Sequence, residues 1–229
     1  MTGEVLDTFV DEVNGGASIG STLKFQLINL YKALIEQRRP WMVLRYTDTS
    51  KTVTTASTWQ TAIDLSTIAR LNRFYGGFPI RLFDGNNRIE RYRQVPIEER
   101  LYHKDVPNTF CYDEANKTLY LNGTVAFAGT LYISHIKDSP DLTSDVSSSW
   151  VFPSWSHALL GFGAVGIHKG GIDFDDINAR MSPENRAQAE QLFQMLEKQD
   201  DAKQLASIET YDPTGSDGGY RTGAIDMNG

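Results

Sequence analysis

The chain has 229 residues, of which 40% are hydrophobic, 11% aromatic and 22% charged. This balance is typical of a soluble globular protein and excludes an intrinsically disordered chain. The net charge of −7 argues against a protein that clamps nucleic acid by neutralising phosphates. The single cysteine, Cys111, excludes an internal disulfide and a cysteine-rich zinc site, and it suits a reducing compartment.

The N-terminal segment "MTGEVLDTFVDEVNGG" is acidic and lacks the basic start and apolar core of a signal peptide. The chain also lacks a run of about 20 consecutive apolar residues, which a spanning helix needs. We therefore expect a protein that folds in the cytoplasm and does not enter a membrane.

Two helices are predicted at the start of the chain. Apolar residues at helical spacing between positions 4 and 13 predict a short helix that ends at Gly15 and Gly16. Ser21 is a good N-cap for a longer helix through Arg39, with leucines spaced three or four apart along one side. Pro40 ends it, because the residue before a proline avoids the α region.

Between residues 41 and 142 the pattern changes to period two. "WMVLRYTD" and "KTVTTAST" predict two strands joined by a turn at residues 48–50, and "FPIRLFDGNNRIERYRQV" predicts a hairpin. Three or four more strands follow between residues 108 and 138, after one helical turn near residues 96–102. This count predicts a small antiparallel sheet or sandwich.

Helical signals return after the serine-rich segment "TSDVSSS". Pro153 begins a helix that ends at Gly170, and Ser182 with Pro183 begins another that runs to about Ile208. The predicted fold class is α+β: a helical bundle (1–40 and 150–208) with an inserted antiparallel β domain (41–142) and an extended C-terminal arm (209–229).

The stretch Gly161-Phe162-Gly163-Ala164-Val165-Gly166 matches the dinucleotide fingerprint G-x-G-x-x-G. That fingerprint needs a strand before it and a helix after it, whereas here a helix precedes and only three residues follow before Gly170. Each glycine inside a helix costs about 1 kcal/mol relative to alanine. We therefore interpret Gly161, Gly163 and Gly166 as sites of close helix packing, either inside the bundle or against a neighbouring subunit.

No constellation of catalytic, cofactor-binding or metal-binding residues is predicted. His157 and His168 are about 16 Å apart along a helix axis and cannot share a metal. The acids Asp173, Asp175 and Asp176 lack the spacing of a calcium loop. Cys111 has no partner pattern nearby. A small hydrolase or metal enzyme remains a remote alternative.

The last 21 residues are polar and rich in glycine, and such a segment does not order on its own. Its spaced apolar side chains predict an arm that orders on binding, although a solvated linker is also possible. The candidate anchors are Tyr211, Tyr220, Ile225 and Met227, with Arg221 beside them.

The combination of segments resembles a known family. A helix ending in "EQRRPWMVLRYTDTS" leads into the β region, "FPSWSHALLGFGAVGI" and "SPENRAQAEQLFQMLEKQ" follow as paired helices, and a Tyr/Gly/Asp tail ends the chain. This order is similar to that of tailed-bacteriophage head–tail adaptor (connector) proteins, including the tubular adaptors of short-tailed phages. The likeness spans residues 20–229 and rests on element order rather than on an invariant motif.

The resemblance implies a homo-oligomeric ring, usually of about twelve copies, in the virion neck beneath the portal. The arm residues Tyr211, Tyr220, Arg221, Ile225 and Met227 would bind the portal protein, and the β region would face a tail or nozzle protein. Double-stranded DNA would pass through the lumen without sequence-specific binding, which suits an acidic chain. The β region is longer than in short-tailed adaptors, which leaves the tail-side partner open. The alternative is another neck or tail-completion protein that contacts the tail rather than the portal.

Overall fold

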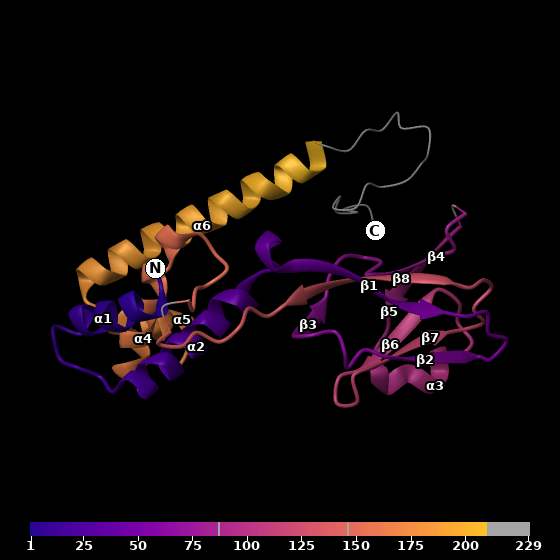
Figure 1. Ribbon diagram of the computed structural model, residues 1–229, viewed down its shortest axis with the longest axis horizontal. Helices are drawn as coiled ribbons and strands as arrows, with labels where there is room; N and C mark the ends of the chain where they lie inside the picture. The colour runs from indigo at the N-terminus through magenta and orange to yellow at the C-terminus, as the bar shows by residue number, and fades with distance from the viewer. Residues whose placement is uncertain (87, 146, 210–229) are drawn as a thin grey trace. The chain divides into compact units, whose positions relative to one another are not determined.

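The computed structural model describes residues 1–86, 88–145 and 147–209 (Figure 1). They divide into two compact units. The helical unit consists of Met1–Leu44 and the described residues from Asp138 onward, and the β unit consists of Arg45–Lys137. Each unit buries its own set of apolar side chains.

The helical unit is built from α-helices and two short 3-10 turns. In chain order these are α1 (Gly3–Val13), α2 (Ser21–Arg38), η1 (Met42–Leu44), η3 (Ser154–Ser156), α4 (Ala158–His168), α5 (Phe174–Arg180) and α6 (Pro183–Glu209). The helices expected near residues 4–13, 21–39 and 183–208 are confirmed. The sequence did not predict α5, whose N-cap Asp173 accepts a hydrogen bond from the backbone N–H of Asp176.

Helix α4 is the centre of the helical unit. Every residue from Leu159 to Gly166 is buried. A helix that is apolar on all sides needs neighbours on all sides. Helices α1, α2, α5 and α6 supply them, and Figure 1 shows α1, α2 and α5 gathered around α4.

A pair of buried charges on α2 holds the chain where it re-enters the helical unit. The Nζ atom of Lys32 donates to the carbonyl oxygens of Ser139, at 3.0 Å, and Pro140, at 3.1 Å. One turn along, Glu36 accepts hydrogen bonds from the backbone N–H and the hydroxyl of Ser139. It also accepts one from the indole N–H of Trp150 at 2.7 Å. These contacts satisfy both charges away from water.

The β unit contains eight strands and a short helical segment. They are β1 (Arg45–Val53), β2 (Gln60–Asp64), β3 (Leu71–Phe74), β4 (Ile80–Phe83), β5 (Ile89–Gln94), η2 (Ile97–Glu99), α3 (Arg100–His103), β6 (Thr109–Asp113), β7 (Thr118–Asn122) and β8 (Gly129–Lys137). The order in the sheet is β1-β8-β4-β5-β6-β7-β2, with β3 also paired to β8. Leu82, Phe110, Leu121 and Ile133 are among the fully buried residues of its core.

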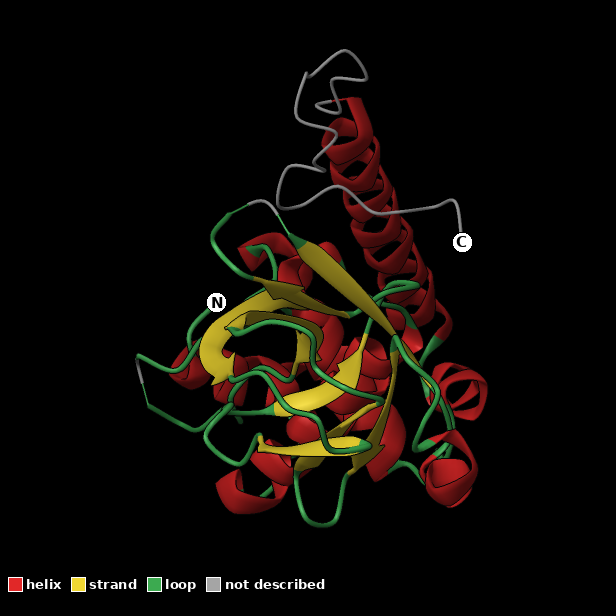
Figure 2. Cartoon of the chain, turned by 90° about the vertical axis from the view of Figure 1, so that its right-hand side faces the viewer, coloured by secondary structure: helices red, strands yellow, loops and turns green. Residues whose placement is uncertain are grey.

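The predicted fold class is wrong. The fold is mixed α/β, with eight strands in a curled half-barrel sheet as the dominant element and six α-helices among the described residues. Figure 2 shows the curl of the sheet. The sheet is not purely antiparallel either, because β5 and β6 pair in parallel across the η2–α3 connection. Local periodicity reveals single strands, whereas the pairing of β8 with β1, β3 and β4, which joins them into one sheet, is long-range.

The predicted hairpin at residues 41–58 is also replaced. Residues Arg45–Val53 form one strand, whose register on β8 shifts between Asp48 and Lys51. The polar turn signal at residues 48–50 therefore marks a β-bulge rather than a chain reversal. Trp41, expected in the first strand, is instead fully buried in the helical unit.

Candidate functional site

The three glycines of the G-x-G-x-x-G stretch all lie inside α4 and leave no room for a side chain. A Cβ atom at Gly163 would lie 2.0 Å from the ring of Tyr31 in α2. One at Gly166 would lie 2.6 Å from the carbonyl oxygen of Ile177 in α5, and one at Gly161 would lie 2.5 Å from a phenylalanine ring of α1. These neighbours belong to the same chain, so the close approach occurs within the helical unit.

The same stretch does not form a phosphate cradle. A dinucleotide-binding turn connects a strand to the N-terminus of a helix. Here the 3-10 turn η3 comes before α4, and Gly161 is already the fourth residue of the helix.

The other residues weighed for chemistry have structural surroundings. Burial raises the pKa of the Cys111 thiol, which favours its protonated form near neutral pH. The two ring nitrogens of His157 lie 2.9 Å from the carbonyl oxygens of Met1 and Phe152. Within residues 1–209, apart from positions 87 and 146, no three His, Cys, Asp or Glu side chains are grouped so as to hold a metal ion. In that part of the chain no helix is long and apolar enough to span a membrane.

The acids near residue 173 order the start of α5. Asp173 accepts from the backbone N–H of Asp176 at 2.8 Å. Asp176 accepts from the backbone N–H of Ile172 at 3.1 Å and pairs with Arg180 at 3.4 Å. Their carboxylates therefore act as caps and helix partners.

The predicted arm anchors Tyr211, Tyr220, Arg221, Ile225 and Met227 lie outside the described residues. Their assignment stays a prediction.

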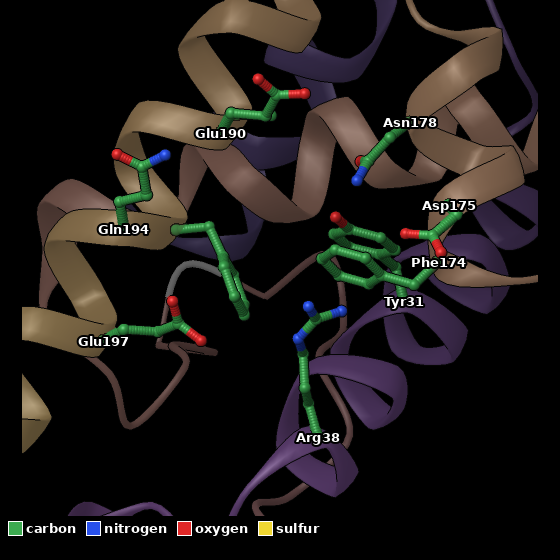
Figure 3. A pocket seen from close by; sticks show the side chains of 10 residues that line it. Tyr31, Arg38, Phe174, Asp175, Asn178, Glu190, Gln194 and Glu197 are labelled. Carbon is green, nitrogen blue, oxygen red and sulfur yellow. The ribbon is translucent and has the colours of Figure 1, made fainter.

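A pocket opens in the helical unit where α2, α5 and α6 meet (Figure 3). Its volume is about 250 Å³, which equals roughly eight water molecules and can admit one long side chain. It is lined by Tyr31, Arg38, Phe174, Asp175, Asn178, Ala189, Glu190, Phe193, Gln194 and Glu197.

Aromatic rings and one arginine form the inner part of this pocket. The guanidinium carbon of Arg38 lies 4.3 Å from the ring centre of Phe174 and 5.1 Å from that of Phe193. Tyr31 stacks on Phe174, with ring centres 5.7 Å apart and planes 9° apart. Burial raises the pKa of the Tyr31 hydroxyl, and the nearby charge of Arg38 offsets part of that rise. The Tyr31 hydroxyl is therefore neutral at physiological pH. Arg38 is held in place by its cation–π contacts with the two phenylalanine rings.

Carboxylates surround this aromatic part. Asp175, Glu190 and Glu197 contribute three negative charges, which exceed the single positive charge of Arg38. Glu190 also pairs with Arg186, one turn earlier on α6, at 2.8 Å. Aromatic faces and carboxylates together bind guanidinium and ammonium groups well. The pocket is therefore suited to a cationic side chain from a partner.

The β unit carries a net positive charge, opposite in sign to the acidic pocket. Residues 45–137 contain 12 Lys and Arg residues and 9 Asp and Glu residues, which gives a net charge of +3. Because the whole chain carries −7, the other residues together carry −10. On the sheet, Arg81 of β4 lies directly opposite Arg91 of β5. Arg93, two residues along β5, lies on the same face and is exposed. Arg81 and Arg91 are half-buried, so Arg93 is the most exposed of the three cations on this basic face.

A second surface of the β unit is apolar. Leu101 and Tyr102 on α3 are 72% and 87% exposed, and Trp59 and Val106 beside them are also exposed. The backbone N–H of Gly123 bonds to the carbonyl oxygens of both Trp59 and Lys104, which ties the loop before β2 to the end of α3. We call the four exposed residues, Trp59, Leu101, Tyr102 and Val106, the α3 patch.

The sequence matches no protein-family model and no curated protein.

Sequence reasoning missed the pocket, the basic face and the α3 patch. The Arg81–Arg91 pairing could have been found, because the Asp84-Gly85 signal predicts the hairpin in which the two residues pair. The pocket could not, since it combines Tyr31 and Arg38 with side chains more than 130 positions away.

Proposed function

We propose that this chain is a structural subunit of a tailed-bacteriophage neck, forming a homo-oligomeric ring adaptor between the portal and the tail. The resemblance in element order motivates the proposal. It assigns the chain no catalytic step, cofactor or metal. Double-stranded DNA passes through the ring without sequence-specific contacts.

The observation that carries the proposal is the α3 patch. Leu101 and Tyr102 are 72% and 87% exposed on a unit that already has a buried apolar core. Burying one such side chain contributes about 1.5–3 kcal/mol. Clustered exposed apolar side chains mark protein interaction sites. We assign the α3 patch to the tail-side partner, in line with the placement that the resemblance implies for the β region.

A closed ring adds a further requirement. Copies joined head to tail need two different surfaces, one for each neighbour. The acidic pocket of the helical unit and the basic face of the β unit have opposite charge, and they support this arrangement. The portal is assigned to the arm at residues 209–229, with Tyr211, Tyr220, Arg221, Ile225 and Met227 as its anchors.

The test is mass photometry and negative-stain imaging of the full chain, alone and mixed with the portal protein of the same phage. We expect a ring of about twelve copies, free or on the portal. Deletion of residues 210–229 should abolish portal binding while thermal unfolding stays as in the wild type.

Two results would count against this assignment. A chain that stays monomeric both alone and with portal contradicts the ring adaptor. A ring that binds a tail protein but not portal identifies the alternative, another neck or tail-completion protein.

A further inference from the structure

We propose that the acidic pocket of one copy binds an arginine from the basic β4–β5 face of a second copy, and that this contact joins neighbouring subunits. The inference rests on the proposed ring and adds to it the two surfaces that meet. The donor is Arg93, supported by Arg81 and Arg91 on the same face. The acceptors are Glu190 and Glu197 on α6, with Asp175 on α5.

The chemistry of the pocket selects this occupant. Figure 3 shows Glu190 and Glu197 on one side of the pocket and Asp175 on the other, with the Arg38 side chain between them. Arg38 already lies over Phe174 and Phe193, so an entering guanidinium would bind through its N–H groups to the carboxylates beside them. The three carboxylates are opposed by Arg38 and by Arg186, which pairs with Glu190, so one net negative charge remains to attract a second cation and repel an anion.

The β4–β5 face supplies the matching cations. Arg91 is a direct cross-strand partner of Arg81, and Arg93 follows on the same face with its side chain exposed. An anionic surface placed against the exposed Arg93 gains charge-assisted hydrogen bonds with its guanidinium. Residues 45–137 carry a net charge of +3, and the rest of the chain carries −10. The β unit of one copy is therefore complementary in charge to the helical unit of a second copy.

The contact predicts a charge-swap result. Arg93→Glu and Glu197→Lys should each weaken self-association at least tenfold in mass photometry at about 0.1 M salt. An equimolar mixture of the two variants should restore assembly to within threefold of the wild type. In a mixed ring with alternating copies, each contact pairs either the two native residues or the two reversed ones.

Matched controls separate this contact from a general charge effect. Lys117→Glu, in the turn between β6 and β7, and Glu184→Lys, in the first turn of α6 and outside the pocket, make the same charge changes elsewhere. Both should assemble as the wild type does. Circular dichroism of each variant establishes that it is folded.

The outcomes distinguish this contact from the ring itself. If the wild type assembles and both swaps assemble equally well, or their mixture gives no rescue, the contact is wrong and the ring stands. If deletion of residues 210–229 abolishes self-association while Arg93→Glu does not, the arm rather than this contact joins the copies, and the contact is again wrong. If the wild type fails to self-associate both alone and with portal, the ring and the contact are both overturned.

Discussion

The helical unit and the β unit differ in what they bury. Among the described residues, the buried Lys, Asp and Glu side chains are Lys24, Lys32, Glu36 and Asp200, and all four lie in the helical unit. The buried polar residues of the β unit are uncharged or histidine: Thr109, Asn122, Ser134 and His135.

The reason for the difference lies in what each charge holds. Lys32 and Glu36 bind the irregular segment at Ser139 and Pro140, and Asp200 accepts from the backbone N–H of Met42 at 2.7 Å. Strands fix one another through their backbone ladder, whereas a segment between elements needs directional side-chain bonds. The helical unit therefore uses buried charge to place its connections, whereas the β unit obtains the same order from its sheet.

The largest effect is expected from a cavity in the apolar core of the β unit. Leu119 is fully buried on β7, and Leu119→Ala should lower the free energy of unfolding by about 3–4 kcal/mol. Leu101→Ala, on the exposed α3 patch, should change it by less than about 0.5 kcal/mol. Urea unfolding followed by hydrogen exchange should show the loss of protection in the β unit. If the two substitutions change the free energy of unfolding equally, Leu119 does not lie in an apolar core.

A second test concerns the close packing around α4. Gly163→Leu should destabilise the helical unit by about 3 kcal/mol or prevent folding, because even a Cβ atom would lie 2.0 Å from the Tyr31 ring. Gly77→Leu, where a Cβ atom meets nothing within 4 Å, is the control and should be nearly neutral. Thermal unfolding of both proteins measures the difference. Wild-type stability in Gly163→Leu would show that the helices can move apart.

A third test removes one buried charge. Glu36→Gln keeps the shape but gives up a carboxylate that accepts from Ser139 and Trp150 and lies one turn from Lys32. The expected loss is about 2 kcal/mol in urea unfolding. Glu12→Gln, an exposed position on α1, should stay within about 0.5 kcal/mol of the wild type. If Glu36→Gln leaves the free energy of unfolding unchanged, the buried charge does not hold the segment at Ser139 in place.

The smallest effect is a pH dependence in the helical unit. The hydrogen bond from Lys24, at 2.8 Å, lowers the pKa of the Asp11 carboxyl below 3.8, its value without such partners. A carboxyl whose pKa is lowered by folding stabilises the fold above its unfolded pKa, and that stabilisation is lost as the pH falls through the folded pKa.

Asp11→Asn should therefore flatten the decline in stability below about pH 4, since it removes one titrating group with this behaviour. Urea midpoints of the wild type and Asp11→Asn, measured between pH 7 and pH 2.5, give the two slopes. Identical slopes for the two proteins would exclude Asp11 as a source of the pH dependence.

Elements whose signals are local could be predicted from the amino-acid sequence alone. Pro40 marks the end of α2, and Ser182 with Pro183 marks the start of α6, because caps and prolines act within one turn. The prediction of Ser21 as the N-cap of α2 is wrong, because Gly20 occupies that position and Ser21 is the first helical residue. The β4–β5 hairpin also followed from its turn residues. The small residues of α4 indicated close packing, but the sequence left open whether the neighbour was inside the chain or outside it.

How the strands join and which side chains meet depends on long-range packing. The parallel β5–β6 pair and the shared strand β8 made the curled sheet the dominant element, and strand pairing leaves no trace in the period-two pattern. The pocket depends on Arg38 reaching Phe174 and Phe193, which lie on separate helices. Such contacts depend on how whole helices and strands pack, and no single segment encodes them.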